Sequence, residues 1–389
     1  MIKPVSQNFF KFIRSEQASG VILITCVLIS LLVANSSANE GFKKLLDLQF
    51  GIESNSIHLK YSVLNWINDG LMAIFFFLIG LEIKKEIIDG HLSDFKIAAV
   101  PILAAVGGAI IPAIIFTVLN FGEVTAKGWA IPMATDIAFA LGVLALLGKS
   151  IPPALKVLLS TLAVVDDLLA IIVIAVFYSA ALHWLYLLIS LSIFLLLLLM
   201  NKLGVKHLAF YIIPGVVLWY FIHHSGIHAT IAGVLTALTI PTNSKSGSLV
   251  DKAAHSLTTP VNFIIMPLFA LANTNIHFEA GMMSGVINTL GLGIILGLLI
   301  GKPAGVMLFA WLSVKSKIGS LPESITWKYI AGMGLLAGIG FTMSIFISLL
   351  SFGNSAYDIE AKFAILIASA IAGVGGFIYL RSLTVKQND

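Results

Sequence analysis

Thr161-Leu-Ala-Val-Val-Asp-Asp-Leu-Leu-Ala170 sets two adjacent carboxylates, Asp166 and Asp167, inside an apolar run that extends from about 153 to 178. A helix needs roughly 20 residues to cross the hydrocarbon core of a bilayer. A charged side chain at the centre of such a helix costs about 2.5–3.5 kcal/mol on insertion scales, so it marks a functional site by default. This stretch therefore predicts a transmembrane helix that carries the chemistry of the protein.

The rest of the chain has the same apolar character. Of its 389 residues 58% are hydrophobic and only 11% are charged, whereas soluble domains have about 25% charged residues. Twelve apolar segments, including short ones at 207–222 and 226–240, predict an all-α integral membrane protein of about 12 transmembrane helices. We expect one transmembrane transporter domain over residues 1–389. The basic residues form no cluster, which argues against nucleic acid as a partner and leaves membrane lipid.

Lysine and arginine indicate the orientation of these spans. With both termini in the cytoplasm, 17 of the 23 basic residues face the cytoplasmic side, as the positive-inside rule requires. The first outer loop contains two short β-like segments on either side of Glu53-Ser54-Asn55. The alternation predicts a β-hairpin over residues 48–60, with a turn of three residues.

Four charged residues are expected deep in the spans: Asp136, Asp166, Asp167 and Lys302. Three acids against one base favour a cation site. Two close carboxylates in a medium of low dielectric resist joint ionisation, so a proton and a cation can compete for Asp166 and Asp167. Na⁺ prefers oxygen ligands, as other hard cations do. The alternative is a pair of acids held by structural hydrogen bonds.

Asp136 follows Pro132 and Thr135 in the segment 127–147. Proline inside a span frees backbone groups and favours an interrupted helix. A carboxylate at such an interruption either neutralises two facing helix N-termini or ligates the ion, and both hypotheses stay open here. Thr135 either supplies a hydroxyl oxygen to the site or bonds to its own helix.

Lys302 belongs to a ladder of glycines, each four residues apart: Gly293, Gly297, Gly301 and Gly305. This spacing places all four on one helix face and allows another backbone to approach closely. A buried lysine needs an acidic partner, and Asp166 and Asp167 are the candidates. The pair is either purely structural or also carries protons.

A second interrupted span is predicted by Gly338-Ile-Gly-Phe-Thr-Met-Ser-Ile-Phe346. It is the second span of the group 287–381, as the Pro132 span is the second of the group 97–178. The two groups start from opposite membrane faces, which is the pattern of inverted repeats whose interrupted helices cross at mid-membrane around a transport site.

Glu82 and Glu86 share one helix face near the cytoplasmic end of the second span, beside Lys84 and Lys85. The arrangement is typical of a charged helix end at the headgroups. The alternative is a proton-sensing funnel at the mouth of a cavity.

Together these residues resemble a known family. The segments 77–86, 130–142, 165–167, 301–303 and 338–346 are similar, in order and spacing, to the motifs of bacterial NhaA sodium/proton antiporters. The resemblance extends from about Phe9 to Arg381 and implies an electrogenic Na⁺(Li⁺)/H⁺ antiporter of the bacterial inner membrane. It implies a secondary active transporter without a cofactor, and not an enzyme.

The resemblance also implies roles for individual residues. Asp167 would be the principal ion carboxylate, and Asp166 its partner, paired with Lys302. Thr135 and Asp136 would support the crossing of the two interrupted helices. The hairpin at 48–60 would join two protomers in a homodimer. Glu82 and Glu86 would belong to a pH-response region, to which the stretch 251–260 contributes a single histidine, His255, where the family has an acidic, histidine-rich stretch.

Two other classes of protein compete with a transporter. An intramembrane aspartyl protease needs two aspartates that face each other across a water, which adjacent residues on one helix do not do. A cation channel favours rings of carbonyls or acids from several subunits. The glycine ladder and the paired interruptions favour moving halves instead.

Overall fold

A computed structural model describes residues 16–54, 58–88, 90, 95–179, 182–242, 248–278, 286–353 and 355–385. Throughout these ranges the chain is helical, apart from loops and one two-stranded antiparallel sheet. It separates into two compact units. Unit 1 comprises the described residues within 1–24, 91–170 and 278–389, and unit 2 those within 25–90 and 171–277.

Unit 1 holds the interrupted helices and the acidic pair. Its elements are α6 (Phe95–Leu119), η3 (Val124–Gly128), η4 (Ile131–Met133), α7 (Ile137–Leu146), η5 (Gly148–Ser150), α8 (Pro153–Phe177), α15 (Thr289–Leu296), η7 (Gly297–Gly301), α16 (Lys302–Lys315), α17 (Trp327–Ala337), α18 (Phe341–Phe352) and α19 (Ala356–Val385). The last turns of α8 belong to unit 2.

Unit 2 holds the β-hairpin. Its elements are α2 (Glu16–Ala34, whose first turns belong to unit 1), α3 (Asn39–Asp47), β1 (Gln49–Glu53), β2 (His58–Ser62), α4 (Val63–Asn65), η1 (Trp66–Leu71), α5 (Met72–Ile88), α9 (Trp184–Lys202), α10 (Ala209–His224), α11 (Thr230–Thr239), α12 (Leu249–Pro260), η6 (Val261–Ile265) and α13 (Met266–Asn273).

The helices have the length and composition of membrane spans. Within the described residues, six helices are long and apolar enough to cross a bilayer, and up to nine if each of three bent pairs counts as one span. All twelve apolar segments predicted from sequence coincide with helices. Several are too short or too broken to qualify singly, so the count of 12 stays a prediction. The protein is a multi-pass membrane protein.

Both predicted interruptions are present. Residues 124–133 and α7 meet at an angle of 43°, and α17 and α18 meet at 45°. At the first break, Pro132 occupies a short 3₁₀ turn and Ala134 and Asp136 are extended. At the second, Gly338 and Gly340 flank Ile339, which is completely buried. Each break exposes backbone groups that the helix no longer satisfies.

The glycine ladder packs against α6, as its spacing predicts. A Cβ atom built on Gly301 would lie 2.9 Å from the Cα atom of Pro112, and one on Gly305 would collide with the backbone of Gly107. A Cβ on Gly297 would lie 2.7 Å from the Cβ of Pro132. The absence of side chains on this face brings α16 against α6 and against the first interruption.

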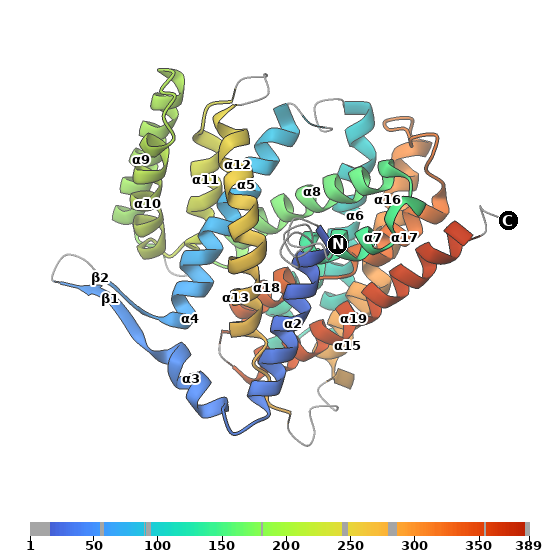
Figure 1. Cartoon of the computed structure of the whole chain (residues 1–389), viewed down its shortest axis with the longest axis horizontal. Coiled ribbons are helices and arrows are strands. Elements are labelled where there is room, and N and C mark those ends of the chain that lie inside the picture. Colours follow the sequence, from blue (N-terminus) through green and yellow to red (C-terminus); the bar gives the residue numbers. More distant parts are fainter. Residues whose placement is uncertain are drawn as a thin grey trace, which may run out of the picture. The chain divides into compact units, whose positions relative to one another are not determined.

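The hairpin of unit 2 lies between α3 and α4, as Figure 1 shows. Gln49 pairs with Ser62 and Glu53 with His58. Gly51 has φ +136° and lies against the backbone of Leu59. The strands thus run from 49–53 and 58–62, close to the predicted 48–60, and the centre of the turn lies outside the described residues.

One boundary differs from the sequence prediction. We expect the ninth span to begin near residue 257, whereas α12 begins at Leu249. The Ser248 hydroxyl accepts a hydrogen bond from the amide of Asp251 at 3.1 Å, which is an N-cap. This polar first turn extends the helix beyond its apolar part.

We predict that Gly305→Ala lowers the free energy of unfolding by ~1–3 kcal/mol, because the added methyl group overpacks a backbone contact. The control is Gly375→Ala in α19, where nothing lies within 4 Å of the added carbon. It should be neutral or stabilise by up to ~1 kcal/mol through helix propensity. Unfolding of the two purified variants in detergent would measure the difference, and equal stability would contradict the packing argument.

Candidate ion site

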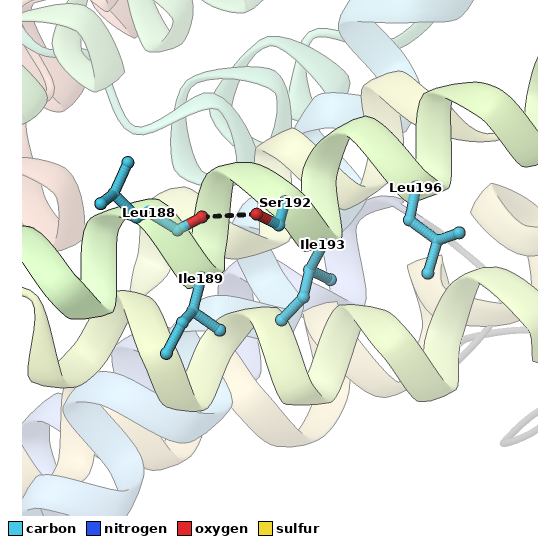
Figure 2. Close-up of a pocket in the computed structure, with 5 residues that line it drawn as sticks. All are labelled: Leu188, Ile189, Ser192, Ile193 and Leu196. Carbon is cyan, nitrogen blue, oxygen red and sulfur yellow. Dashed lines mark hydrogen bonds between the residues drawn. The ribbon is translucent and has the colours of Figure 1, made fainter.

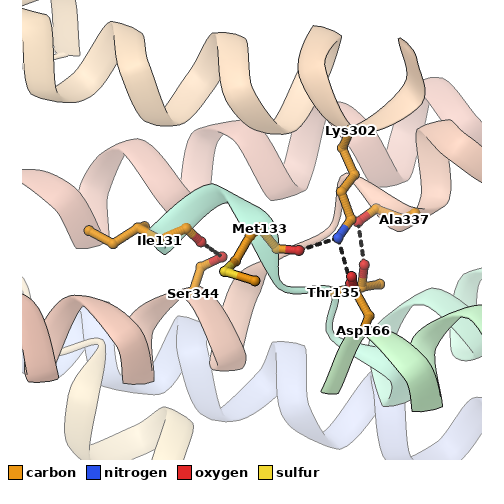
Figure 3. Close-up of polar contacts among 7 residues, drawn as sticks. All are labelled: Ile131, Met133, Thr135, Asp166, Lys302, Ala337 and Ser344. Atoms are coloured by element: carbon orange, nitrogen blue, oxygen red, sulfur yellow. Dashed lines mark hydrogen bonds and ion pairs between the residues drawn. The ribbon is translucent and has the colours of Figure 1, made fainter. Parts of the chain in front are cut away.

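The two interruptions are hydrogen-bonded to each other. The Asp136 amide donates to the carbonyl of Ile339 at 2.7 Å. The Thr135 hydroxyl donates to the carbonyl of Ala337 at 2.9 Å. From the other side, the Ser344 hydroxyl donates to the carbonyl of Ile131 at 2.7 Å (Figure 3). Each broken helix thus satisfies backbone groups that the other has exposed.

Asp136 caps two helices at once. Its Oδ1 accepts the amide of Phe139 in the first turn of α7 at 2.9 Å. Its Oδ2 accepts the amide of Thr342 in the first turn of α18 at 3.2 Å, and the Thr342 hydroxyl as well. A helix N-terminus carries roughly half a positive charge, so a carboxylate between two of them lies in a favourable field. Both oxygens of Asp136 are engaged in this way.

Lys302 is completely buried, and its ammonium has two partners (Figure 3). It lies 2.5 Å from Oδ2 of Asp166, and it donates to the carbonyl of Met133 at the end of η4. The sequence leaves Asp166 and Asp167 as possible partners of Lys302, and the structure pairs Lys302 with Asp166. Asp167 also interacts electrostatically with this ammonium.

The acidic pair lies in the interior of unit 1. Asp166 and Asp167 have exposed fractions of 0%. Besides Lys302, the Asp166 carboxylate interacts with the side chain and backbone of Thr135 at the first interruption. Asp166 and Asp167 thus place two carboxylates against one ammonium. This excess of negative charge in a water-poor interior suits a monovalent cation or a proton.

Sequence reasoning missed several groups of this cluster. Thr342 and Ser344 lie within the glycine-containing motif 338–346, but nothing in the motif says which carbonyl or carboxylate they reach. Ser369 in α19 accepts the amide of Phe341 at 3.1 Å. The carbonyl of Met133 leaves no trace in the sequence, since any residue supplies one.

A further buried acid lies apart from this cluster. Asp358, at the start of α19, is 2% exposed. It pairs with Lys362 one turn later at 2.6 Å and accepts the hydroxyl of Ser348 at 2.7 Å. Its spacing of four residues from Lys362 is the signal that could have revealed the pair.

The expected pH-response residues lie in unit 2. Glu82 is half-buried on α5, and Glu86 faces it from the next turn. Lys84 donates to the carbonyl of Leu238 in the last turn of α11 at 2.6 Å and to that of Ile240, just after the helix, at 2.5 Å. Lys85 pairs with Asp251 of α12 at 3.0 Å. His255, three residues after Lys252, is exposed.

A hollow on α9 offers no comparable chemistry. It is lined by Leu188, Ile189, Ser192, Ile193 and Leu196 (Figure 2). Its one hydroxyl, that of Ser192, donates to the carbonyl of Leu188 at 2.8 Å. The other lining side chains are aliphatic, so this surface suits lipid and not an ion.

A multi-pass membrane protein whose two interrupted helices meet beside buried carboxylates has the architecture of a membrane transporter. Residues 10–380 match the family described as Na⁺/H⁺ antiporter 1, and the chain belongs to that family.

Three relatives illustrate the likeness. The chain is 60% identical to Na(+)/H(+) antiporter NhaA 2 of Flavobacterium johnsoniae, over 98% of this chain and 94% of the relative. It is 50% identical to Na(+)/H(+) antiporter NhaA of Flavobacterium psychrophilum, over 96% and 95%. It is 44% identical to Na(+)/H(+) antiporter NhaA of Salmonella paratyphi A, over 97% and 98%.

We predict that Lys302→Met destabilises the protein by about 3–5 kcal/mol, because it leaves the charge of Asp166 buried without its ammonium. The double variant Asp166→Asn with Lys302→Met should recover part of that loss, since it removes both charges. Chemical unfolding in detergent would measure Asp166→Asn, Lys302→Met and the double variant. If the double variant were as unstable as the sum of the two single variants, the two side chains would not be coupled.

Proposed function

We propose that this protein is a sodium/proton antiporter that expels Na⁺, and also Li⁺, in exchange for protons. The exchange is electrogenic, with more protons entering than cations leaving. Membership in the Na⁺/H⁺ antiporter 1 family supports the exchange, and so do the names of relatives that match nearly the whole chain. It is a secondary active transporter, not an enzyme, and requires no cofactor.

The observation that carries this proposal is the buried pair Asp166 and Asp167 with an ammonium held at one of them. Na⁺ and Li⁺ are hard cations and coordinate carboxylate oxygens. Two adjacent carboxylates in a buried site do not both keep their charge without a counter-ion. A cation that binds Asp166 and Asp167 therefore displaces a proton, and a returning proton displaces the cation.

Lys302 and Asp136 have different parts in this mechanism. Lys302 neutralises Asp166 when no cation is bound; a cation that approaches Asp166 weakens this ion pair, so the ammonium can release its proton during exchange. Asp136 has both oxygens engaged by the first turns of α7 and α18. This favours charge compensation at the crossing, with Thr135, over ligation of the ion.

Transport proceeds by alternating access. The site opens to one side of the bacterial inner membrane at a time, as the segments with the interrupted helices move. Both termini lie in the cytoplasm, and the proton gradient drives sodium out. The groups 97–178 and 287–381 form the inverted repeats that place the two interruptions opposite each other.

Glu82 and Glu86, with His255, form the region that adjusts activity to pH. The mutual repulsion of Glu82 and Glu86 supports this proposal. So does the position of α5, which Lys84 and Lys85 tie to α11 and α12. A change in charge at Glu82 thus acts on a helix end that is bonded to two neighbours.

The two rival classes fit the geometry less well. A carboxylate dyad of a protease shares one proton between two acids, whereas Asp166 contacts the ammonium of Lys302. A channel needs a continuous pore, whereas the Ala337 and Ile131 carbonyls at the breaks are bonded across the crossing.

In inside-out vesicles that contain this protein, we expect added Na⁺ or Li⁺, but not K⁺, to collapse a pre-formed pH gradient. A ΔpH-sensitive dye would follow the response over about pH 6.5–8.5, where histidines and perturbed carboxylates titrate. Asp167→Asn should abolish it, because the variant loses an anionic ligand. Asp358→Asn, a change at the buried acid outside the cluster, serves as control. Exchange at the native rate in Asp167→Asn would sink the proposed mechanism.

The second copy of a homodimer would bind at the hairpin. Phe50 and Ile52 expose 62% and 65% of their surfaces there, and an isolated two-stranded hairpin is marginal in water. We predict that Phe50→Ser with Ile52→Ser converts a dimer into a monomer, measured by crosslinking and by mass in detergent. The control is His58→Ser on β2, the neighbouring strand of the same hairpin. A variant that stays dimeric would place the interface elsewhere.

A further inference from the structure

One apolar groove of unit 1 has a positive charge near one end. It is lined by Ala304, Met307, Leu308 and Trp311 of α16 and by Trp327 in the first turn of α17, and its volume is about 500 Å³. Cavities of this size hold small ligands or part of a lipid. The small side chain of Ala304 forms one end of the groove.

Two aromatic rings and a cation lie at the other end. The Lys315 ammonium is held 4.3 Å from the centre of the Trp311 ring, a cation–π contact. Trp311 and Trp327 expose 41% and 37% of their surfaces. The groove thus passes from aliphatic groups through an aromatic pair to a fixed positive charge.

The dimensions match half of a bilayer. Lys302 is the middle residue of the 27-residue span Thr289–Lys315. Trp311 lies nine residues further, or about 13 Å along the helix, near the edge of a hydrocarbon half-layer of about 15 Å. Lys315 lies about 20 Å from the middle, at the depth of the headgroups.

The charge near this end is positive. Lys315, Lys317 and Lys328 are exposed, and Glu323 is the one acid between residues 303 and 331. Among the described residues, none of these lysines forms an ion pair with an acid. In the proposed orientation this end faces the cytoplasmic leaflet, where anionic lipids give a negative surface potential.

We propose that this groove is a binding site for one anionic phospholipid. One acyl chain of the lipid lies along Ala304, Met307 and Leu308. The part of the chain nearest the headgroup contacts the two indole rings. The phosphate of the lipid headgroup is bound by Lys315 and Lys328. The site lies beside α16, which carries Lys302, and α17, which ends at the helix crossing. A lipid bound there contacts both helices on one side of the ion site.

The test uses the full-length protein, delipidated in neutral detergent and titrated with phosphatidylglycerol or with phosphatidylcholine of the same chains. The shift of the unfolding temperature gives an apparent affinity. Phosphatidylglycerol should stabilise the protein at concentrations where phosphatidylcholine does not. Chains brominated near the headgroup should quench tryptophan fluorescence less in Trp311→Phe than in the parent protein.

Lys315→Gln and Lys328→Gln should each weaken the apparent affinity for phosphatidylglycerol about fivefold, the factor that corresponds to ~1 kcal/mol for one basic residue near a membrane surface. Ala304→Leu, which fills the groove, should weaken it at unchanged charge. Two matched controls lie on α9: Lys202→Gln in its last turn and Ser192→Leu in its uncharged hollow. Both should bind as the parent protein does.

Three outcomes would overturn the proposal. Equal stabilisation by phosphatidylcholine would mean that charge does not select the lipid. Equal stabilisation by water-soluble glycerophosphate would mean that the groove is not used. Equal weakening in the α9 controls would mean that any such change on the apolar surface lowers the affinity, with no specific site at this groove. Loss of Na⁺-dependent proton exchange is not among these readouts, so the site can be tested whether or not the proposed transport is correct.

Discussion

The structure depends on the electrostatic balance at the crossing of two broken helices. A helix that stops inside a membrane leaves backbone amides and carbonyls without partners, and hydrocarbon offers none. Here each break supplies partners to the other, through the amide of Asp136 and the hydroxyls of Thr135 and Ser344. The carboxylate of Asp136 then faces two N-termini, while the ammonium of Lys302 faces a carbonyl end. These charges offset the partial charges at the helix ends that the breaks create.

The same electrostatic balance leaves an excess of negative charge at the acidic pair, Asp166 and Asp167. Because Asp136 is engaged by α7 and α18, and Lys302 by Asp166 and Met133, the cluster retains more acid than base. An interior of low dielectric magnifies that excess. The excess of negative charge at the acidic pair thus follows from the same helix breaks that hold the cluster in place.

The sequence predicts the interruptions well because proline and glycine act on their own backbone. Pro132 and the glycines of 338–340 lie within the two breaks, and the ladder from Gly293 to Gly305 packs as its spacing requires. For the ion-pair partner of Lys302, the sequence alone leaves two candidates, Asp166 and Asp167. Neighbours on a helix point about 100° apart, so the choice between them depends on where α16 lies.

Other features depend wholly on tertiary contacts. The choice between charge compensation and ion ligation for Asp136 depends on the contacts of its two oxygens with Thr342 and Phe139, which come from tertiary structure. Ser344 and Ser369 are ordinary hydroxyls in apolar helices until their acceptors and donors are known. α12 begins earlier than its apolar pattern predicts, because Ser248 and Asp251 form a polar cap outside that pattern.

The glycine ladder has a mechanical consequence. Ladder positions such as Gly301 and Gly305 lie against α6 backbone so closely that no Cβ fits between them. A slide of one helix along the other would bring the side chains between the ladder positions, such as that of Leu298, against that backbone. The close packing therefore favours movement of α16 and α6 together as one unit. Lys302 moves with α16, while Asp166 belongs to α8. A movement of α16 relative to α8 would therefore lengthen or break the ion pair between Lys302 and Asp166.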